Sequence, residues 1–233
     1  MEIGKYHDNP ALVEELTRQR YAENSNISLP AEYEMFVKKD LLRFLIRLAR
    51  YKFVARMLSP TDRVLEVGSG SGLGAQFLSQ HCESVLGLEV KDYEVDEAKT
   101  INRRDNVEFR LQDLYDFSSD EPFDVAVCLD VIEHMPVEEG RRLLRSMVGH
   151  LRPDSGMLVV GSPSIHSYPY QSEISRASHV KCYDQDELGS LITEVCYRVL
   201  PFSMNDEMLH TGHPKMSWYY VFLGVGPKKE GAK

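Results

Sequence analysis

The chain has 233 residues, a formal net charge of −9 and hydrophobic side chains at 42% of its positions. A chain of this length forms one domain with an appendage and buries a substantial core. The acidic charge disfavours a nucleic-acid partner, and the sequence shows neither a signal-peptide pattern nor an apolar run near the ~20 residues of a membrane span.

The cysteines are too scattered for a zinc site built from cysteine pairs, and one of them lies within an apolar strand pattern. Reduced thiols in a cytoplasmic protein are the simplest interpretation of this spacing. The four positions are Cys82, Cys128, Cys182 and Cys196.

Two helical patterns precede the first strand, over residues 10–21 and 31–58. In the second pattern, apolar side chains alternate with lysines and arginines. Such a helix usually covers its own domain, although basic amphipathic helices also bind membranes or partner proteins. We therefore assign residues 1–58 to an N-terminal helical cap and residues 59–233 to the main domain.

An apolar strand over residues 63–67 runs directly into a turn with glycine at every second position. Glycine lacks a Cβ, so four glycines in one turn indicate a ligand that lies against the backbone. A helix begins at Leu73, which puts the turn at the carboxyl edge of the sheet, where α/β domains bind ligands. The spacing differs from the dinucleotide pattern G-x-G-x-x-G, because Leu73 stands where the third glycine would be.

The pattern E-x-G-x-G-x-G in this turn resembles motif I of the class I S-adenosylmethionine-dependent methyltransferases. The alternative is a tight turn that only seats a helix on a strand. The resemblance implies that the methionine part of S-adenosylmethionine packs against the turn. The residues that match the motif, and are predicted to bind this cofactor, are Glu66, Gly68, Ser69, Gly70 and Gly72.

Two acids follow the next predicted strands at the same edge. Glu89 ends the strand over residues 84–89, about 20 residues beyond the glycines, where a carboxylate can accept hydrogen bonds from a ribose diol or merely cap a helix. Asp113 follows the strand over residues 107–111. The resemblance implies that Asp113 receives the adenine amino group, and the alternative is a solvated turn. Further cofactor contacts are predicted at Val90, Gln112 and Leu114.

A fourth strand, over residues 123–130, is almost continuously apolar and leads into the phrase D-V-I-E-H. Many small-molecule methyltransferases of class I carry this phrase after their fourth strand, which makes it a second resemblance. A buried strand alone would not gather acids and a histidine at the end that faces the ligand crevice. The resemblance implies that Asp130 and Val131 contact the cofactor and that His134 supports the pocket or takes part in catalysis.

The remaining sequence continues the α/β pattern, with helices over residues 137–150 and 184–195 and strands over residues 157–161, 197–203 and 216–225. The resemblance covers about residues 60–227. It implies a Rossmann-like α/β fold with a seven-stranded, mostly parallel sheet, an antiparallel last strand, helices on both faces and the N-terminal helical cap.

A long polar and aromatic connection over residues 162–183 is expected to serve function, because connections of this length are uncommon in compact domains. Its phrase S-H-V-K-C-Y contains His179 and resembles the H-x-x-x-[FY] phrase in the substrate loop of quinone and sugar O-methyltransferases. A hydroxyl acceptor must lose a proton, and histidine is the usual base, so His179 is predicted as base or substrate ligand rather than as an exposed loop residue. Predicted acceptor contacts, or simple packing residues, are Tyr168, Tyr170 and Tyr183.

These patterns predict an S-adenosylmethionine-dependent methyltransferase that acts on a small molecule, at a hydroxyl oxygen. Methylation of nitrogen, of a carboxylate or of a protein stays open, as does a non-catalytic cofactor-binding module, because only the cofactor half is shared. No metal site is predicted, because His210-Thr-Gly-His213 falls on a turn without a second ligand pair. A polar stretch over residues 22–28 predicts a hinge about which residues 1–30 close as a lid over the cofactor.

Overall fold

The computed structural model describes residues 10–23, 29–206 and 208–228. Its strands are β1 (Arg63–Val67), β2 (Ser84–Glu89), β3 (Val107–Leu111), β4 (Val125–Leu129), β5 (Met157–Pro163), β6 (Cys196–Met204), β7 (Leu209–His210) and β8 (Tyr219–Pro227). Its helices are α1 (Pro10–Glu23), α2 (Ala31–Lys39), α3 (Leu41–Met57), α4 (Leu73–Leu78), α5 (Asp92–Ile101), α6 (Val137–Gly149), α7 (Glu173–Ser178) and α8 (Gln185–Val195). Short 3-10 turns are η1 (Leu114–Asp116), η2 (Ile132–His134), η3 (Ile165–Tyr170) and η4 (Pro214–Met216).

The strands form one sheet in the order β3-β2-β1-β4-β5-β8-β6-β7. β1 to β5 are parallel, and β8 runs antiparallel between β5 and β6. The prediction of a mostly parallel sheet with an antiparallel last strand is therefore confirmed. The predicted count of seven strands is wrong, because β7 adds an eighth strand at the edge of the sheet. It pairs only two residues with β6, which is too short for an alternating sequence pattern.

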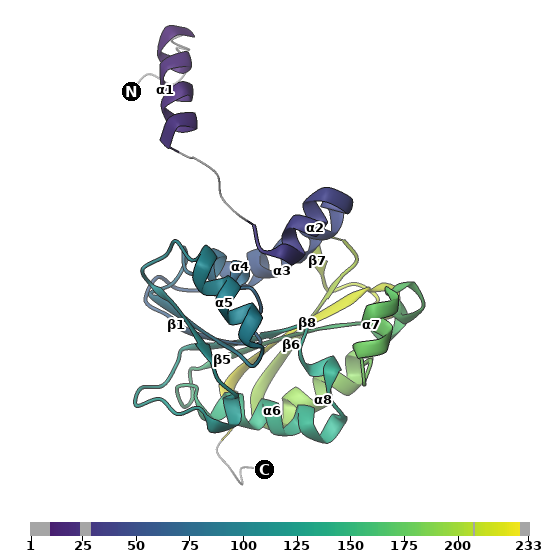
Figure 1. The fold of residues 1–233 in the computed structure, drawn as a ribbon. Coiled ribbons are helices and arrows are strands. Elements are labelled where there is room, and N and C mark those ends of the chain that lie inside the picture. Colours follow the sequence, from purple (N-terminus) through teal and green to yellow (C-terminus); the bar gives the residue numbers. More distant parts are fainter. Residues whose placement is uncertain (1–9, 24–28, 207, 229–233) are drawn as a thin grey trace, which may run out of the picture.

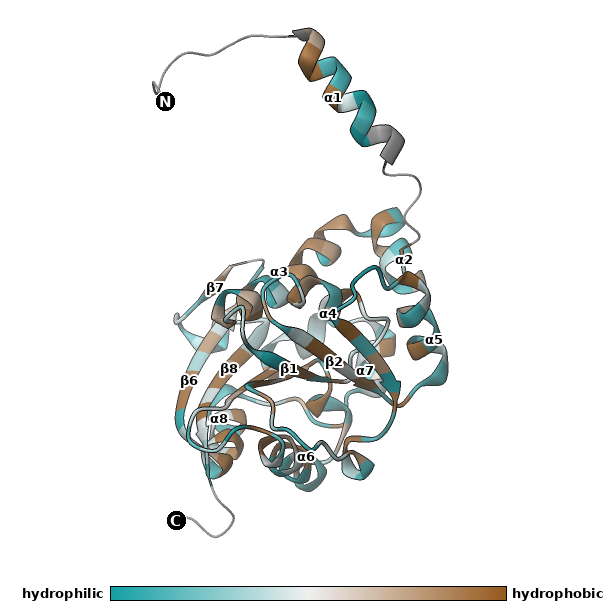
Figure 2. Ribbon diagram, turned by 90° about the vertical axis from the view of Figure 1, so that its left-hand side faces the viewer, coloured by the Kyte–Doolittle hydropathy of each residue, from teal (hydrophilic) through white to brown (hydrophobic). Residues whose placement is uncertain are grey.

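Helices cover both faces of the sheet, as predicted (Figure 1). On one face α3, α4 and α5 pack through fully buried residues such as Val54, Leu78 and Ala98. On the other face α6 and α8 pack through Leu144 and Leu188. The central strands lie between these two layers, so every residue of β4 is buried and its sequence is continuously apolar. Figure 2 shows many hydrophobic residues along the strands of the sheet, whereas the helices carry a mixture of hydrophobic and hydrophilic residues.

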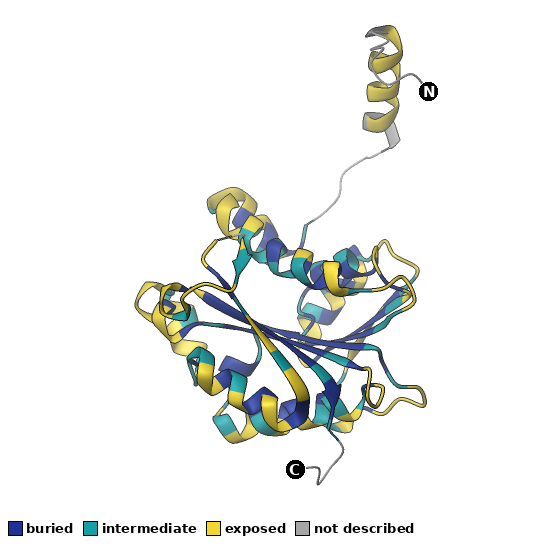
Figure 3. Cartoon of the chain, turned by 180° about the vertical axis from the view of Figure 1, so that it is seen from behind, coloured by how far each residue is buried: buried dark blue, intermediate teal, exposed yellow. Residues whose placement is uncertain are grey.

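The N-terminal helices differ in detail from the predicted pattern. The helix predicted over residues 31–58 is two helices, because Asp40 leaves the helical conformation (φ −157°, ψ 70°) and accepts a hydrogen bond from the backbone N–H of Arg43 at 3.0 Å as the N-cap of α3. Residues 11–20 of α1 are all exposed, and α1 stands apart from the sheet and its helices (Figure 3). Most of the predicted hinge, residues 24–28, lies outside the described residues.

In the described part of the chain, no helix is both long enough and apolar enough to span a bilayer.

Candidate active site

A cavity of about 730 Å³ opens at the carboxyl ends of β1, β2, β3 and β4. The segments that follow these parallel strands line it, together with residues of α2, α3 and α7. This is the edge at which α/β sheets bind ligands. The predicted site residues that line the cavity are Gly68, Ser69, Gly70, Glu89, Val90, Gln112, Asp113, Leu114, Asp130, Val131 and His134.

The glycine turn after β1 depends on left-handed backbone angles. The φ angle is +72° at Gly68, +52° at Gly70 and +80° at Gly72. A Cβ at Gly68 would overlap the side chain of Val131, and a Cβ at Gly72 would lie 2.5 Å from the ring of Phe109. The first two glycines reach the cavity, whereas Gly72 seats the turn against β3 and does not line the cavity.

Glu89, the last residue of β2, connects the glycine turn after β1 to the segment that follows β2 at the edge of the cavity. Its side chain is buried, and its Oε2 accepts a hydrogen bond from the N–H of Gly70 at 3.0 Å. Its Oε1 accepts from the N–H groups of Val90 and Lys91 at 2.8 and 3.1 Å. A carboxylate offers about four acceptor sites, so these three bonds leave about one for a ligand.

The segment after β3 adds a second acid to the cavity. The backbone N–H of Gln112 donates to the carbonyl oxygen of Glu89 at 2.9 Å, which joins this segment to β2. Asp113 is exposed, and its Oδ1 accepts from the N–H of Tyr115 at 3.0 Å as the cap of η1. The cap fixes the Asp113 carboxylate at the cavity wall.

Glu66 is not on the cavity, although its motif position predicted a cofactor contact. Its side chain is 1% exposed, forms a hydrogen bond with the Tyr51 hydroxyl and leaves Oε2 without a partner. Burial raises the pKa of Glu66 from 4.5 to about 8, against the hydrogen bond from Tyr51 and with a smaller contribution from the charge of Glu89. The group is therefore protonated at neutral pH.

Helix α3 contributes side chains that the sequence analysis did not place at the site. Arg47 and Tyr51 line the cavity. Arg50 forms an ion pair with Asp130, and its guanidinium carbon lies 3.8 Å from the centroid of the Tyr219 ring. Spacings of three and four residues put these α3 side chains on one face of the helix. The sequence feature that could have revealed them is the presence of polar groups on an otherwise apolar helix face.

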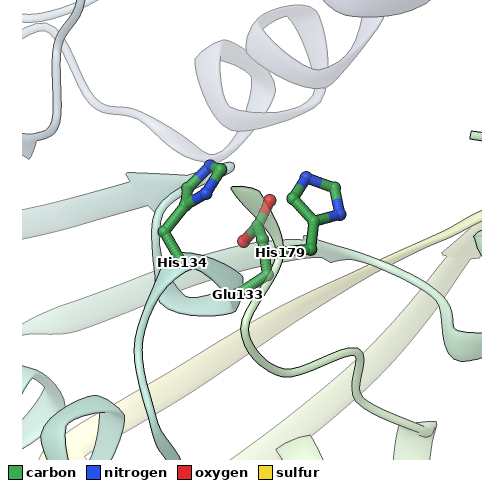
Figure 4. Close-up of side chains that lie close together, drawn as sticks. All are labelled: Glu133, His134 and His179. Atoms are coloured by element: carbon green, nitrogen blue, oxygen red, sulfur yellow. The ribbon is translucent and has the colours of Figure 1, made fainter. Parts of the chain in front are cut away.

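The two predicted histidines meet beside the cavity, next to Glu133 (Figure 4). The ring centroids of His134 and His179 are 5.1 Å apart, with the rings at 70°. Burial lowers the pKa of His179 below its ordinary 6.5, and the neighbouring His134 lowers it further. Burial raises the pKa of Glu133 to about 8, with a contribution from the charge of Asp130.

The three predicted acceptor tyrosines lie away from the cavity lining. Tyr183 is fully buried in the core on the α6 and α8 side of the sheet. Tyr168 and Tyr170 are exposed on η3, and the Tyr170 ring packs against Trp218 with 5.0 Å between centroids. His179 does not line the cavity either, whereas Ile174 and Ser178 in the same connection do. They were missed because α7 has no clear apolar period.

The parallel sheet and its ligand edge define a Rossmann-like domain. Residues 64–154 match the family model of the methyltransferase domain. The N-methyltransferase NodS from Bradyrhizobium japonicum, solved with S-adenosylhomocysteine, superposes with a TM-score of 0.60 at 21% identity, over 77% of this chain and 86% of that chain. Residues 64–154 are therefore similar to the methyltransferase domain, and the fold is that of NodS.

Relatives in sequence match over a shorter part of this chain than the NodS structure does. The ubiquinone biosynthesis O-methyltransferase of Coxiella burnetii is 26% identical over 113 residues, which cover 47% of this chain and 47% of that protein. The protein of the same name from Rickettsia felis is 30% identical over 101 residues, which cover 42% and 40%. The chain thus spans less than half the length of these relatives.

Proposed function

We propose that the protein transfers a methyl group from S-adenosylmethionine to a hydroxyl oxygen of a small molecule. The observation that carries the proposal is the cavity at the carboxyl edge, where the glycine turn, Glu89 and Asp113 come together beside two histidines. The O-methyltransferase names of the relatives favour an oxygen acceptor, and the S-adenosylhomocysteine in the NodS structure favours this cofactor.

The proposed cofactor pose follows from the donors and acceptors on the cavity. Glu89 accepts from the ribose diol, Asp113 from the adenine amino group, and the backbone at Gly68 and Gly70 packs against the methionine part. Because three backbone N–H groups already occupy Glu89, a diol that donates two hydrogen bonds displaces at least one of them. Cofactor binding is therefore expected to shift the glycine turn or the start of α5.

The reaction is an in-line displacement, in which alignment of the reactants supplies much of the rate. The acceptor oxygen forms a bond to the methyl carbon as the bond from carbon to sulfur breaks, and S-adenosylhomocysteine leaves as a neutral thioether. The hydroxyl proton must also leave, and we assign its removal to His179, with His134 as its neighbour. The acceptor then lies between the cavity and the η3 to α7 connection.

We place the enzyme in the cytoplasm, with neither nucleic acid nor membrane as a partner. Its four cysteines are free, and three of them are buried in the core, which suits a reducing compartment. Residues 1–58 form the proposed helical cap and residues 59–233 the catalytic domain.

Methyl transfer from isotope-labelled S-adenosylmethionine to a panel of phenols, sugars, amines and carboxylates tests the proposal. We expect label in hydroxylated acceptors, and near-complete loss of turnover in His179→Ala but not in His213→Ala, whose exposed histidine lies outside the cavity lining. Label only in amines or carboxylates would contradict an oxygen acceptor. Binding of S-adenosylhomocysteine without transfer to any acceptor would instead indicate a non-catalytic binding module.

A further inference from the structure

Two separate segments bring a carboxyl group and two imidazoles together at one point. Glu133 and His134 belong to η2, and His179 follows α7. One ligand atom from each of the three side chains lies within 4.8 Å of the others. Figure 4 shows the carboxyl group of Glu133 between the two imidazole rings. A carboxylate with two imidazoles is a donor set that binds divalent metal ions.

The hydrogen bonds around the cluster leave its ligand atoms available. The Nδ1 of His134 lies 3.0 Å from the carbonyl oxygen of Ser178, so it carries the proton and leaves the lone pair of Nε2 free. Metal-binding histidines usually donate their second N–H to such a carbonyl. The Oε2 of Glu133 accepts from the Ser162 hydroxyl at 3.3 Å, while its Oε1 and the Nδ1 of His179 are buried without a partner.

No positively charged side chain among the described residues already occupies the place that a metal ion would take beside Glu133. Glu133 is 1% exposed, and among the described residues no lysine or arginine forms an ion pair with it. The nearby Arg50 is paired with Asp130, and Lys181 is paired with Glu187. Ionised Glu133 without a counter-charge is costly, and a bound cation would offset that cost when the carboxyl group gives up its proton.

We propose that Glu133, His134 and His179 bind one divalent transition-metal or zinc ion. Two imidazoles favour such ions over magnesium or calcium, which prefer oxygen ligands. Three protein ligands leave positions for oxygen ligands, and the cluster adjoins the cavity through His134. The role of the ion, unlike its binding, rests on the proposed function. In that reaction the ion would lower the pKa of the acceptor hydroxyl, whose proton would leave to water, and His179 would be a metal ligand rather than the base assigned above.

Titration of the chelator-treated full chain with Co²⁺, followed by visible absorption, tests the site without any methyl transfer. We expect one Co²⁺ per chain, with binding weakened at least about tenfold in His134→Gln and in His179→Gln. His213→Gln is the matched control, because it removes an exposed histidine of the only other suggestive spacing, and it should bind as the native chain does. His179→Cys should keep the ion and add a thiolate-to-cobalt absorption band, which loss of folding cannot produce.

Absence of saturable Co²⁺ binding up to about 100 µM, corresponding to a free energy of binding weaker than about −5.5 kcal/mol, would overturn the metal site. Equal affinity in the native chain and both glutamine variants would also overturn it. Calorimetry with S-adenosylhomocysteine on the same samples separates the two proposals. Cofactor binding without cobalt binding rejects only the ion, whereas cobalt binding without cofactor binding supports the ion and rejects the proposed function.

Discussion

At the residue scale, Glu66 departs most from what its position in the glycine motif implied. Its carboxyl group is buried against Tyr51 instead of lining the cavity, and burial raises its pKa to about 8. The nearby charge of Glu89 raises this pKa further. The folded state therefore holds a proton that the unfolded state, with an ordinary pKa of 4.5, releases.

This proton makes stability depend on pH in a definite direction. Between pH 4.5 and about 8 the folded state binds more protons than the unfolded state, so the free energy of unfolding falls as pH rises. Urea unfolding of the native chain from pH 5 to pH 8 should show this fall. Glu66→Gln should flatten it in part, because Glu133, whose pKa is also raised to about 8, contributes the rest. An unchanged slope would show that Glu66 is ionised in the folded protein.

The residues of the site that follow directly after predicted strands could be predicted from the sequence, whereas the positions of those in the connection over residues 162–183 could not. The turn glycines, Glu89 and Asp113 are ordered along the chain by consecutive strands of a parallel sheet, so their meeting at one edge follows from topology. The buried state of Tyr183 depends on packing against α6 and α8, which a polar and aromatic connection without period does not reveal. The meeting of His134 and His179 likewise depends on how that connection folds back.

At the element scale, α3 is the part of the proposed N-terminal cap that reaches the cavity. Its Tyr51 ring occupies the space in which a Cβ of Gly74 would lie, so the first turn of α4 approaches closely. Its Arg50 pairs with Asp130, which follows β4 with a left-handed φ of +58°. The sequence predicted a helical segment over residues 31–58 that covers its own domain, but not that side chains of α3 would line the cavity.

The ion pair predicts a measurable coupling between α3 and the end of β4. The two side chains are only 16% and 21% exposed, so their attraction is weakly screened. A double-mutant cycle with Arg50→Met and Asp130→Asn should give a coupling energy of roughly 1–2 kcal/mol in urea unfolding. Arg56→Met, an exposed position of the same helix, is the control. Additive effects within about 0.3 kcal/mol would mean that the pair does not hold α3 in place.

At the scale of the whole molecule, α1 contributes little to the packed domain in this structure. Its residues 11–20 are exposed, whereas α3 is packed on the sheet. We expect a chain that lacks residues 1–28 to unfold within about 2 °C of the full chain, because few buried contacts are lost. If residues 1–30 close as a lid, the Kd for S-adenosylhomocysteine should rise at least about threefold. An unchanged Kd would reject the lid.

The cofactor site is the central claim, and calorimetry with S-adenosylhomocysteine tests it most directly. The comparison is the native chain against Glu89→Ala, with Glu83→Ala as the control, an exposed acid beside the opposite end of β2. We predict one bound molecule per native chain and per control chain, and at least about tenfold weaker binding by Glu89→Ala, because hydrogen bonds to a charged group contribute roughly 1.5–3 kcal/mol. No binding by the native chain, or equal binding by Glu89→Ala, would contradict the account.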